Sequence, residues 1–589
     1  MSSVNSEPRK AAQVSIAQYM YRNIQLLGFQ NHSRVINVAI RELMDNSLDA
    51  ANQSQMLPRV QIQIKNLKDK KYRISFKDYG PGMDAKQAPQ ICGRLLYGNK
   101  FIQSSAQRGC QGIGLTALIL YSQKTTGTPA KIIVKDKNSP VPTELNLKIN
   151  LKNNRPDVVS QRKLKKENLY YKEEDTGFMV VLDVIAAYQK RGPKATVELL
   201  KQYTYLNPNL TLKFSGPEDS LEVTRISSDL SVPGKSIKAV PHHLEIGDFI
   251  NLCALHSQST LIRFLADNFE GPESTYEEIL RDLFLPVNLL VGHLNKGFYT
   301  DLLRQFKVRF ESLRPHSEVL VDLGPCITTA VTKAGAINFD NVISVKSDPL
   351  YYQKGVLQVE MSAFYGGPTM SADQKIEVYR VANGMPLLYQ SSACVITRTL
   401  IEYNWKKLGL THIQNELPRG KMILFVHVNS TSVPFLTESK DAIAGIDVIR
   451  KTINECLDKL SKMLNSYMKR EEAHLALLEK TKIIKNIVPD LLETLRNALK
   501  RDSPILSKNQ IENLQSGIYQ LLCIYKDSSE RVLRIYNKTL RDYEFNFVSK
   551  GARYPCRVGP NSSVTRDYLD SFYLEDILPV EYVILDSHA

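Results

Sequence analysis

The 589-residue sequence contains no apolar run that could span a membrane as a helix, which takes about 20 residues. Its most apolar stretches, 178–188 and 285–294, fall well short of that length. The first residues, MSSVNSEPRKAAQ, are polar and lack the hydrophobic segment of a secretory signal. We therefore expect neither a membrane span nor export.

Cysteine motifs are missing as well. The eight cysteines are scattered, with no C-x-x-C pair and no histidine at zinc-site spacing. We expect reduced cysteines in a cytoplasmic protein and no metal site of the thiolate kind.

Acidic residues are fewer than basic ones: the sequence has 61 aspartates and glutamates and 76 lysines and arginines, which gives a formal net charge of +15. That balance favours a polyanionic partner, either nucleic acid or an anionic membrane surface, although general solubility also accounts for it. A chain of this length is too long to fold around a single hydrophobic core, so we expect about three to five domains.

Helical periodicity is clearest in residues 33–53, SRVINVAIRELMDNSLDAANQ, with Ser33 as the expected N-cap. One face carries an acidic stripe at positions i, i+3, i+4 and i+7, formed by Glu42, Asp45, Asn46 and Asp49. Like charges at that spacing repel, and Arg41 is the only nearby cation. We therefore expect this acidic stripe to face a ligand and not solvent.

The first domain is predicted to be an α+β sandwich spanning about 1–235. Two alternating segments, 59–66 and 71–78, predict an antiparallel strand pair. A helix is expected at 112–123 and further strands at 131–135, 144–153 and 178–185. Helices would cover one face of the antiparallel sheet.

Three further segments complete the expected multidomain organisation. Residues 236–315 have a helical pattern, and 316–500 alternate between strands and helices. The latter segment includes a long helix, or two, over 442–488 that should end near Pro489. Residues 501–589 mix a helix with segments rich in glycine, proline and tyrosine, and they have no assignment.

Three elements of the first domain together predict a nucleotide site. They are the acidic stripe, the strand-ending turn Asp78–Gly82 (DYGPG), and the glycine-rich loop Gly109–Gly114 (GCQGIG), which opens a helix. Such a loop lets backbone N–H groups approach phosphate oxygens at a helix N-terminus. Each element alone also fits an ordinary turn or an exposed helix face. Their joint occurrence, in order and at compact spacing, favours the site.

Each element also has a chemical role to fill, with ATP and Mg²⁺ as the predicted cofactors. A carboxylate beside a terminal phosphate can orient and deprotonate water, which suits Glu42. Mg²⁺ prefers hard oxygen ligands and keeps several waters, so the amide oxygen of Asn46 suffices. The carboxylate of Asp78 can accept a hydrogen bond from the adenine amino group.

The motifs E-x-x-x-N, D-x-G-x-G and G-x-x-G-x-G, in this order, resemble the Bergerat fold of the gyrase, heat-shock chaperone, histidine kinase and MutL (GHKL) ATPases. Longer stretches between residue 15 and about 445 resemble the B subunits of DNA topoisomerase VI: SIAQYMYRNIQLLGF, RELMDNSLDA, GNKF, RGCQGIGLTALILYSQ, VANGMPLLYQ, WKKLGL and VPFLTESKDAIA. The resemblance implies that ATP is held by Asn46, Asp78, Gly82, Asn99, Lys100, Gly109, Cys110, Gln111, Gly112, Ile113, Gly114, Leu115, Thr116 and Lys440. Cys110 and Asn99 depart from the family, which has glutamine and a small hydroxyl residue there.

The resemblance extends to the later segments. Lys440, in TESKDAIA, matches a catalytic transducer lysine that reaches the γ-phosphate, although a lysine in a polar loop is more often a plain surface residue. Such a lysine would make domain rotation depend on the γ-phosphate. Residues 236–315 would be a helix-two-turn-helix domain and 316–500 an α/β transducer of the ribosomal S5 domain 2-like kind. Residues up to about Gln30 resemble a strap that crosses to a second protomer.

Contacts to DNA are expected from basic side chains in and beside the helical segment. These are Lys235, Lys238, Arg263, Lys307 and Arg309. They could bind phosphates without reading sequence, or they could be plain surface residues.

The resemblance implies the ATPase subunit of an archaeal-type type IIB DNA topoisomerase. ATP-driven dimerisation would gate the passage of one duplex through a double-strand break, which relaxes positive and negative supercoils and decatenates DNA. The sequence has no D-x-D pair for a cleavage metal site, so we expect a partner A subunit to cut double-stranded DNA within an A2B2 heterotetramer. The expected location is the nucleoid-containing cytoplasm, or the nucleus of a eukaryote.

Two alternatives remain from the sequence. The chain could be a non-catalytic scaffold for a DNA-cleaving partner, or a GHKL chaperone or mismatch-repair ATPase. The presence of Glu42, Asn46, Asp78 and Lys440 favours an active ATPase over the scaffold, and WKKLGL and TESKDAIA disfavour the third class.

Overall fold

The structure is a computed structural model that falls into two compact units, Met1–Ser461 and Lys462–Ala589. It describes residues 14–97, 108, 112–165, 170–230, 238–295, 297–315, 320, 323–334, 339–352, 355–367, 370–408, 410–502, 522–527, 532–537, 542–549, 552–559, 562–567, 573–575 and 582–586. None of the helices in these ranges is both long and apolar enough to cross a membrane.

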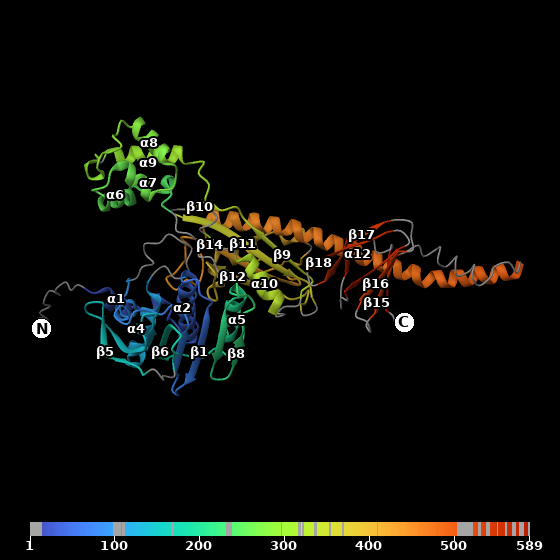
Figure 1. The fold of residues 1–589 in the computed structure, drawn as a ribbon, viewed down its shortest axis with the longest axis horizontal. Coiled ribbons are helices and arrows are strands. Elements are labelled where there is room, and N and C mark those ends of the chain that lie inside the picture. The colour runs from blue at the N-terminus through green and yellow to red at the C-terminus, as the bar shows by residue number, and fades with distance from the viewer. Residues whose placement is uncertain are drawn as a thin grey trace, which may run out of the picture. The chain divides into compact units, whose positions relative to one another are not determined.

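The first unit begins with an eight-stranded sheet in the order β5-β4-β3-β6-β2-β1-β7-β8 (Figure 1). Its strands are β1 Arg59–Asn66, β2 Lys71–Asp78, β3 Ala130–Lys135, β4 Thr143–Asn150, β5 Arg155–Lys163, β6 Gly177–Ile185, β7 Thr211–Ser215 and β8 Ser220–Val223. The predicted antiparallel pair of β1 and β2 is confirmed, with Ile62 opposite Phe76. The β1–β7 pair is parallel.

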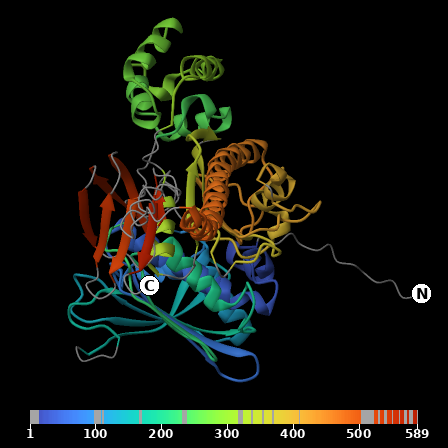
Figure 2. The same ribbon diagram turned by 90° about the vertical axis from the view of Figure 1, so that its right-hand side faces the viewer.

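Helices cover one face of this sheet, as the alternating strands predict. They are α1 Ile16–Arg22, η1 Ile24–Leu27, α2 His32–Gln53, α3 Ala88–Gly93, α4 Gly114–Thr126 and α5 Thr196–Leu206. Figures 1 and 2 show α2, α4 and α5 on the same side of the strands. In β1 the residues at Val60, Ile62 and Ile64 are buried while their neighbours are exposed, so the opposite face of β1 meets solvent.

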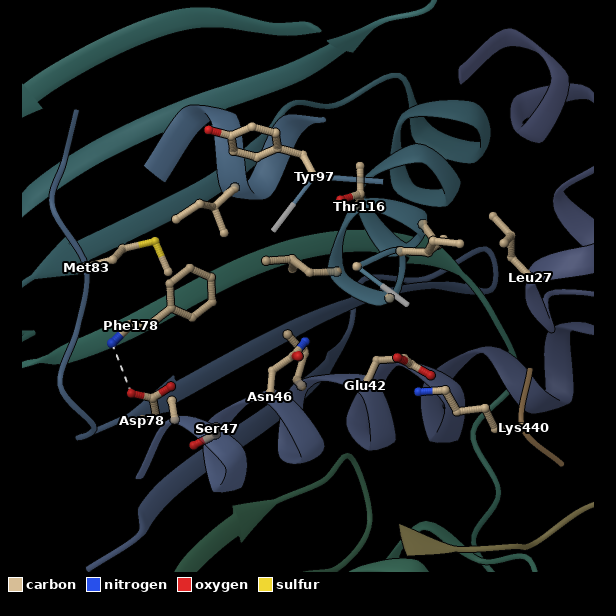
Figure 3. Close-up of a pocket in the computed structure, with 18 of the residues that line it drawn as sticks. Leu27, Glu42, Asn46, Ser47, Asp78, Met83, Tyr97, Thr116, Phe178 and Lys440 are labelled. Carbon is tan, nitrogen blue, oxygen red and sulfur yellow. Dashed lines mark hydrogen bonds between the residues drawn. The ribbon is translucent and has the colours of Figure 1, made fainter. Parts of the chain in front are cut away.

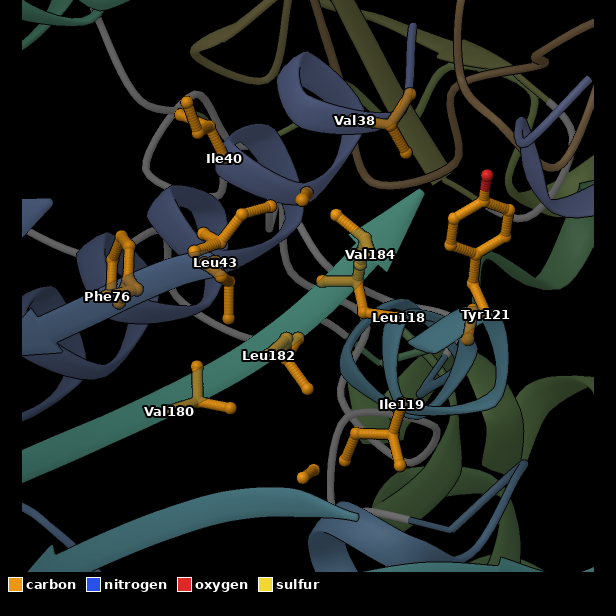
Figure 4. Close-up of a cluster of buried hydrophobic side chains, with 14 of the residues drawn as sticks. Val38, Ile40, Leu43, Phe76, Leu118, Ile119, Tyr121, Val180, Leu182 and Val184 are labelled. Atoms are coloured by element: carbon orange, nitrogen blue, oxygen red, sulfur yellow. The ribbon is translucent and has the colours of Figure 1, made fainter. Parts of the chain in front are cut away.

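The core between helices and sheet is apolar and continuous (Figure 4). Leu43 of α2 and Leu118 of α4 are nearly inaccessible to solvent, as are Phe76 and Leu182 of the strands below them. Burying one such side chain contributes about 1.5–3 kcal/mol relative to leaving it exposed. This packing fixes α2 and α4 against the sheet and so fixes the residues on their remaining faces.

The N-terminus of α2 differs from the expectation by two residues. Asn31 is the N-cap, because its side-chain oxygen accepts a hydrogen bond from the Ser33 backbone N–H at 3.1 Å. Ser33 therefore lies inside the first turn and is not the cap. Both residue types suit an N-cap, so the sequence alone did not separate them.

Residues 238–315 form a helical segment with its own core. It comprises η3 Pro241–His243, α6 Ile246–Leu255, α7 Leu261–Asn268, α8 Glu273–Asp282, η4 Val291–His293 and α9 Gly297–Arg309. Buried aromatic rings from several of these elements pack together, among them Phe249, Phe264, Phe269 and Phe306. The predicted helical pattern is confirmed.

A six-stranded sheet follows, in the order β10-β11-β14-β12-β13 with β9 paired to β11. The elements are α10 Gly324–Ala334, β9 Asn341–Lys346, β10 Leu350–Tyr352, β11 Gly355–Tyr365, β12 Glu377–Ala382, β13 Met385–Pro386, η6 Ser391–Ala393, α11 Val395–Glu402, η7 Trp405–Leu408 and β14 Met422–Ser430. Every residue of β14 is buried, as expected for a central strand. This confirms the predicted alternation of strands and helices.

The long helix α12 runs from Asp447 to Asp502 without a break. At 1.5 Å per residue its 56 residues correspond to about 84 Å. The expected end near Pro489 is wrong. Proline removes one backbone N–H donor, and the leucine- and alanine-containing residues that follow favour continuation of the helix.

The second unit contains two small sheets, ordered β19-β16-β15-β21 and β18-β17-β20. Their strands are β15 Leu522–Asp527, β16 Val532–Asn537, β17 Tyr543–Ser549, β18 Ala552–Val558, β19 Ser562–Asp567, β20 Tyr573–Glu575 and β21 Tyr582–Asp586. Every element described after α12 is a strand. The helix expected in the tail stays a prediction, because much of the tail, including 503–521, lies outside the described residues. Alternation in YEFNFVS, where Phe545 and Phe547 are buried, is the signal that indicates a strand.

Candidate nucleotide-binding site

A cavity of about 320 Å³ opens between α2, the turn after β2 and the start of α4. From α2 it is lined by Glu42, Asn46 and Ala50, which lie one helical turn apart and are the residues of 41–50 that stay partly exposed. Figure 3 shows the side chains of Glu42 and Asn46 rising from the same side of this helix. The structure thus brings the predicted base and the predicted metal ligand to one wall.

The other two residues of the acidic stripe do not face the cavity, so the expectation for the whole stripe is wrong. Asp45 is rotated about 60° from Glu42 around the helix axis. Its Oδ1 accepts a hydrogen bond from the Tyr203 hydroxyl of α5 at 2.7 Å. Asp49 lies two turns beyond Glu42, where the Arg108 guanidinium pairs with it at 3.3 Å.

The strand-ending turn places Asp78 at the opposite end of the cavity from Glu42 (Figure 3). Its Oδ1 accepts hydrogen bonds from the backbone N–H groups of Gly80 at 3.0 Å and Phe178 at 3.1 Å. Burial raises the pKa of Asp78 to about 6, against the lowering effect of these bonds and of a hydrogen bond from the Ser47 side chain. The carboxylate is therefore mostly ionised at neutral pH and can accept further hydrogen bonds.

Two glycines make room where a side chain would collide. Gly82 has a φ of +69°, and a Cβ there would lie 1.9 Å from the carbonyl oxygen of Lys135. A Cβ on Gly114 would lie 2.1 Å from Glu42 Oε2. A side chain at Gly114 would therefore push the Glu42 carboxylate out of the position it holds beside the start of α4.

The start of α4 lines the cavity with Gly112, Ile113, Gly114, Leu115 and Thr116. Ile113 precedes the helix and provides no side-chain cap. The N–H groups of the first turn consequently have no side-chain acceptor there, and the positive end of the helix dipole points at the cavity. Five residues that the resemblance assigns to ATP lie outside the described residues: Asn99, Lys100, Gly109, Cys110 and Gln111.

Apolar residues form the wall around Asp78, and sequence analysis did not single them out. Met83 and Phe178 lie near Asp78 (Figure 3), and Ile91 and Tyr97 also line the cavity. Phe178 opens an alternating strand, which indicates burial but not a ligand contact. Ser47 was missed for a similar reason, because its hydrogen bond to Asp78 depends on tertiary packing.

Lys440 reaches the cavity from the segment after β14, more than 300 residues along the chain from Asp78. It is 4% exposed, and its Nζ donates a hydrogen bond to the Arg108 carbonyl oxygen at 2.9 Å. Its backbone has a φ of +50°, which is uncommon for a residue with a side chain. Figure 3 shows the Lys440 and Glu42 side chains pointing toward one another.

The segment that carries Lys440 is held against α2 by buried charges. Asp441 pairs with Arg34 and, at 3.2 Å, with Arg41 Nη1. Arg41 Nη2 also donates to the Ser439 carbonyl oxygen at 2.5 Å. Burial opposes the charge of Arg41, but Glu42, Asp441 and Asp45 raise its pKa above the usual value. Arg41 therefore stays charged, and the cation predicted to lie nearest the acidic stripe serves as an anchor.

Most of the basic residues expected to contact DNA have partners within the helical segment. Lys238 donates to the Ala266 carbonyl oxygen at 2.6 Å, and Arg263 and Arg309 pair with acidic side chains. Lys307 is exposed, and Lys235 lies outside the described residues. Exposed ion pairs are weak, so these basic side chains can exchange an acidic partner for a DNA phosphate. Phosphate contacts by these residues stay a prediction.

Two family models match the chain. Residues 33–164 match the histidine kinase-, DNA gyrase B- and HSP90-like ATPase model, and residues 315–480 match the transducer of the topoisomerase VI B subunit. Among curated relatives, the type 2 DNA topoisomerase 6 B subunit of Methanococcoides burtonii is 30% identical over 499 residues, covering 84% of this chain and 79% of that protein. The protein of the same name from Saccharolobus shibatae is 28% identical over 529 residues, covering 88% and 96%. That from Archaeoglobus fulgidus is 29% identical over 497 residues, covering 84% and 80%.

Proposed function

Because the chain belongs to the family of type 2 DNA topoisomerase 6 B subunits, we propose that ATP bound in the cavity on α2 drives the passage of DNA. The chain is the ATP-binding and ATP-hydrolysing subunit of a type II DNA topoisomerase, with a GHKL ATPase fold and a topoisomerase VI transducer. The observation that carries the site is the convergence of Glu42, Asn46, Asp78 and Lys440 on one cavity. Glu42 and Asn46 lie one turn apart on α2, whereas Asp78 and Lys440 come from two later segments of the chain.

Adenine would lie at the Asp78 end of the cavity. The carboxylate accepts a hydrogen bond from the adenine amino group, while Met83, Ile91 and Phe178 provide apolar surface for the ring. The phosphates would then extend toward the start of α4. There the uncapped N–H groups of the first turn and the helix dipole stabilise negative charge.

Glu42 would act as the general base. Its side chain is 16% exposed, so it is held by the helix yet open to water in the cavity. Gly114 leaves it the space to stand beside the N-terminus of α4. A carboxylate so placed orients water toward the terminal phosphate and accepts its proton.

The donors present also fit Mg²⁺, which the family implies. The Asn46 amide and the Glu42 carboxylate line the same wall one turn apart, and both are hard oxygen donors. Asn46 would hold the ion and phosphate oxygens and waters would complete its shell. When bound, the ion neutralises charge that develops on the phosphates.

Lys440 would report the γ-phosphate to the transducer. Its ammonium group already lies at the cavity and bonds to a backbone carbonyl, a weaker partner than a phosphate. Bound ATP would draw the ammonium to the γ-phosphate, and hydrolysis would release it. The position of the segment 438–441 relative to α2 would therefore depend on the nucleotide.

The partners are the A subunit and DNA. We propose an A2B2 heterotetramer in which the A subunits cut one duplex and ATP-bound B subunits close around another, with the residues before Gln30 crossing to the second protomer. The proposed domains are 1–235 (strap and ATPase), 236–315 (helix-two-turn-helix), 316–500 (transducer) and 501–589 (extension). Because the substrate is DNA, we expect the enzyme in the nucleoid-containing cytoplasm, or in the nucleus of a eukaryote.

Relaxation of supercoiled plasmid tests this function. The purified chain and its A subunit should relax both signs of supercoil with ATP, and Glu42→Ala should abolish turnover while leaving assembly intact. Equal relaxation by wild type and Glu42→Ala would reject the assigned base. ATP binding without hydrolysis or relaxation in the wild type would instead favour the non-catalytic scaffold.

A further inference from the structure

Arg108, which immediately precedes the glycine-rich loop, joins three separate elements through its guanidinium group. Nη1 pairs with Asp49 of α2 at 3.3 Å, and Nη2 donates to Asn207 Oδ1, just after α5, at 2.9 Å. Nε donates to the carbonyl oxygen of Gly384 at 3.5 Å. Arg108 is 7% exposed, so these contacts form out of water, where a charge needs its partners.

Gly384 belongs to the turn that joins β12 to β13 in the six-stranded sheet. Asn383 and Gly384 both have positive φ, +47° and +74°, as a tight hairpin turn requires. A Cβ on Gly384 would lie 3.0 Å from Arg108 Nη2, so the turn fits closely against the guanidinium. The position therefore excludes larger residues for two independent reasons.

The same turn is tied to the centre of its sheet. The Gly384 backbone N–H donates to His427 Nε2 of β14 at 3.2 Å. Because Nε2 accepts, the proton of this neutral imidazole lies on Nδ1, which donates to Glu360 Oε2 of β11 at 2.9 Å. A continuous chain of buried hydrogen bonds thus leads from Arg108 through Gly384 and His427 to Glu360.

The backbone of Arg108 contacts a residue that lines the cavity. Its carbonyl oxygen accepts the hydrogen bond from Lys440 Nζ. One residue therefore contacts the lysine proposed to sense the γ-phosphate, the helix that carries Glu42, and the turn of the transducer sheet. A shift of Lys440 toward a phosphate would leave this carbonyl without its partner.

We propose that Arg108 is a positioning residue that sets Lys440 in register with the β12–β13 turn, so that occupation of the γ-phosphate site is transmitted to the transducer sheet. The inference rests on the proposed ATPase function. Arg108 acts through Lys440 and not on the nucleotide. Its loss should therefore impair hydrolysis and discrimination between ATP and ADP more than it impairs binding of ADP.

Arg108→Lys tests the proposal, because lysine keeps the charge but cannot reach three partners at once. Misplacement of a reacting group by about 1 Å costs up to about a hundredfold in rate, so we expect kcat to fall by about tenfold or more. Affinity for ADP should stay within about twofold, since ADP lacks the group that Lys440 would contact. Arg73→Lys is the matched control, because Arg73 of β2 is partly exposed and pairs with Asp183 of β6 in the eight-stranded sheet.

A double-mutant cycle separates positioning from simple structural support. If Arg108 acts through Lys440, adding Arg108→Lys to Lys440→Ala should reduce kcat no further than Lys440→Ala alone. Additive losses, or an ADP affinity that falls in parallel with kcat, would overturn the proposal. Wild-type protein without ATPase activity would reject the proposed function itself. If Arg108→Lys does not fold, Asn207→Ala removes one partner and should show the same pattern, and a result like that of Arg73→Lys would overturn the proposal.

Discussion

Replacing Asp78 by asparagine tests how the cavity recognises the adenine ring of ATP. The asparagine oxygen can still accept the N–H groups of Gly80 and Phe178, so the turn should keep its shape. The other carboxylate oxygen becomes an NH₂ donor, which would face the adenine amino donor. A hydrogen bond to a charged group contributes about 1.5–3 kcal/mol, so ATP should bind about 10- to 150-fold more weakly.

The pKa of Asp78 supplies a second signature of the same prediction. With a pKa of about 6, this carboxyl is ionised above that pH and protonated below it. Because Oδ1 accepts the two backbone N–H groups, the proton would sit on Oδ2, which could then no longer accept from the adenine amino group in the same way. Wild-type affinity for ATP should therefore fall as the pH drops through 6. Asp78→Asn should show no such decline between pH 5 and 7, and it should gain relative affinity for GTP, whose O6 accepts.

Equilibrium binding of a fluorescent ATP analogue, with competition by ATP and GTP, measures these effects. Asp84→Asn is the matched control, because Asp84 is an exposed residue of the same loop. Without nucleotide, Asp78→Asn should melt no lower than Asp84→Asn, because ionisation of the buried Asp78 costs stability at neutral pH. An Asp78→Asn protein that binds ATP as tightly as Asp84→Asn would refute the assignment of Asp78 to adenine.

Three further substitutions follow from contacts around the cavity. Gly114→Ala would press on Glu42 Oε2, so steady-state hydrolysis should fall by about tenfold or more while ATP still binds; normal turnover would contradict the placement of the base. Burial raises the pKa of Asp45 to about 7, above its unfolded value, so its ionisation costs stability as the pH rises through 7. The cost builds up between the unfolded pKa of about 3.9 and pH 7, so Asp45→Asn should raise the free energy of unfolding by about 1 kcal/mol or more at pH 8.5 and by less at pH 5, and denaturant titrations in which the difference does not change with pH would contradict this. Asp441→Asn removes the buried partner of Arg41 and should cost about 3 kcal/mol of unfolding free energy, against no loss for the exposed Asp157→Asn.

Local patterns predicted five of the eight strands of the ATPase sheet and missed β5, β7 and β8. Alternation located β1 and β2, and helical periodicity located α2, because both elements bury one face in the same core. The acidic stripe shows the limit of that reasoning. Its spacing indicated a shared face, but Asp45 and Asp49 are occupied by Tyr203 and Arg108, partners that only the folded chain brings near.

Long-range contacts were the other unpredictable part. No local signal placed Lys440 beside the cavity, and only the resemblance to the topoisomerase VI B subunits indicated it. Arg108 and Ser47 gave no signal at all, since their roles depend on tertiary hydrogen bonds. The helix α12 likewise continues past Pro489, because the helix-favouring residues on both sides outweigh the effect of one proline.

Hydrolysis by Glu42→Gln tests the central claim, that this cavity holds ATP and that Glu42 activates water in it. Glutamine has the same shape but cannot accept the proton. General bases contribute about 10²- to 10⁴-fold, so the single-turnover rate should fall at least about a hundredfold while ATP affinity stays within about threefold. A variant that hydrolyses ATP at a rate close to that of the wild type would contradict the account.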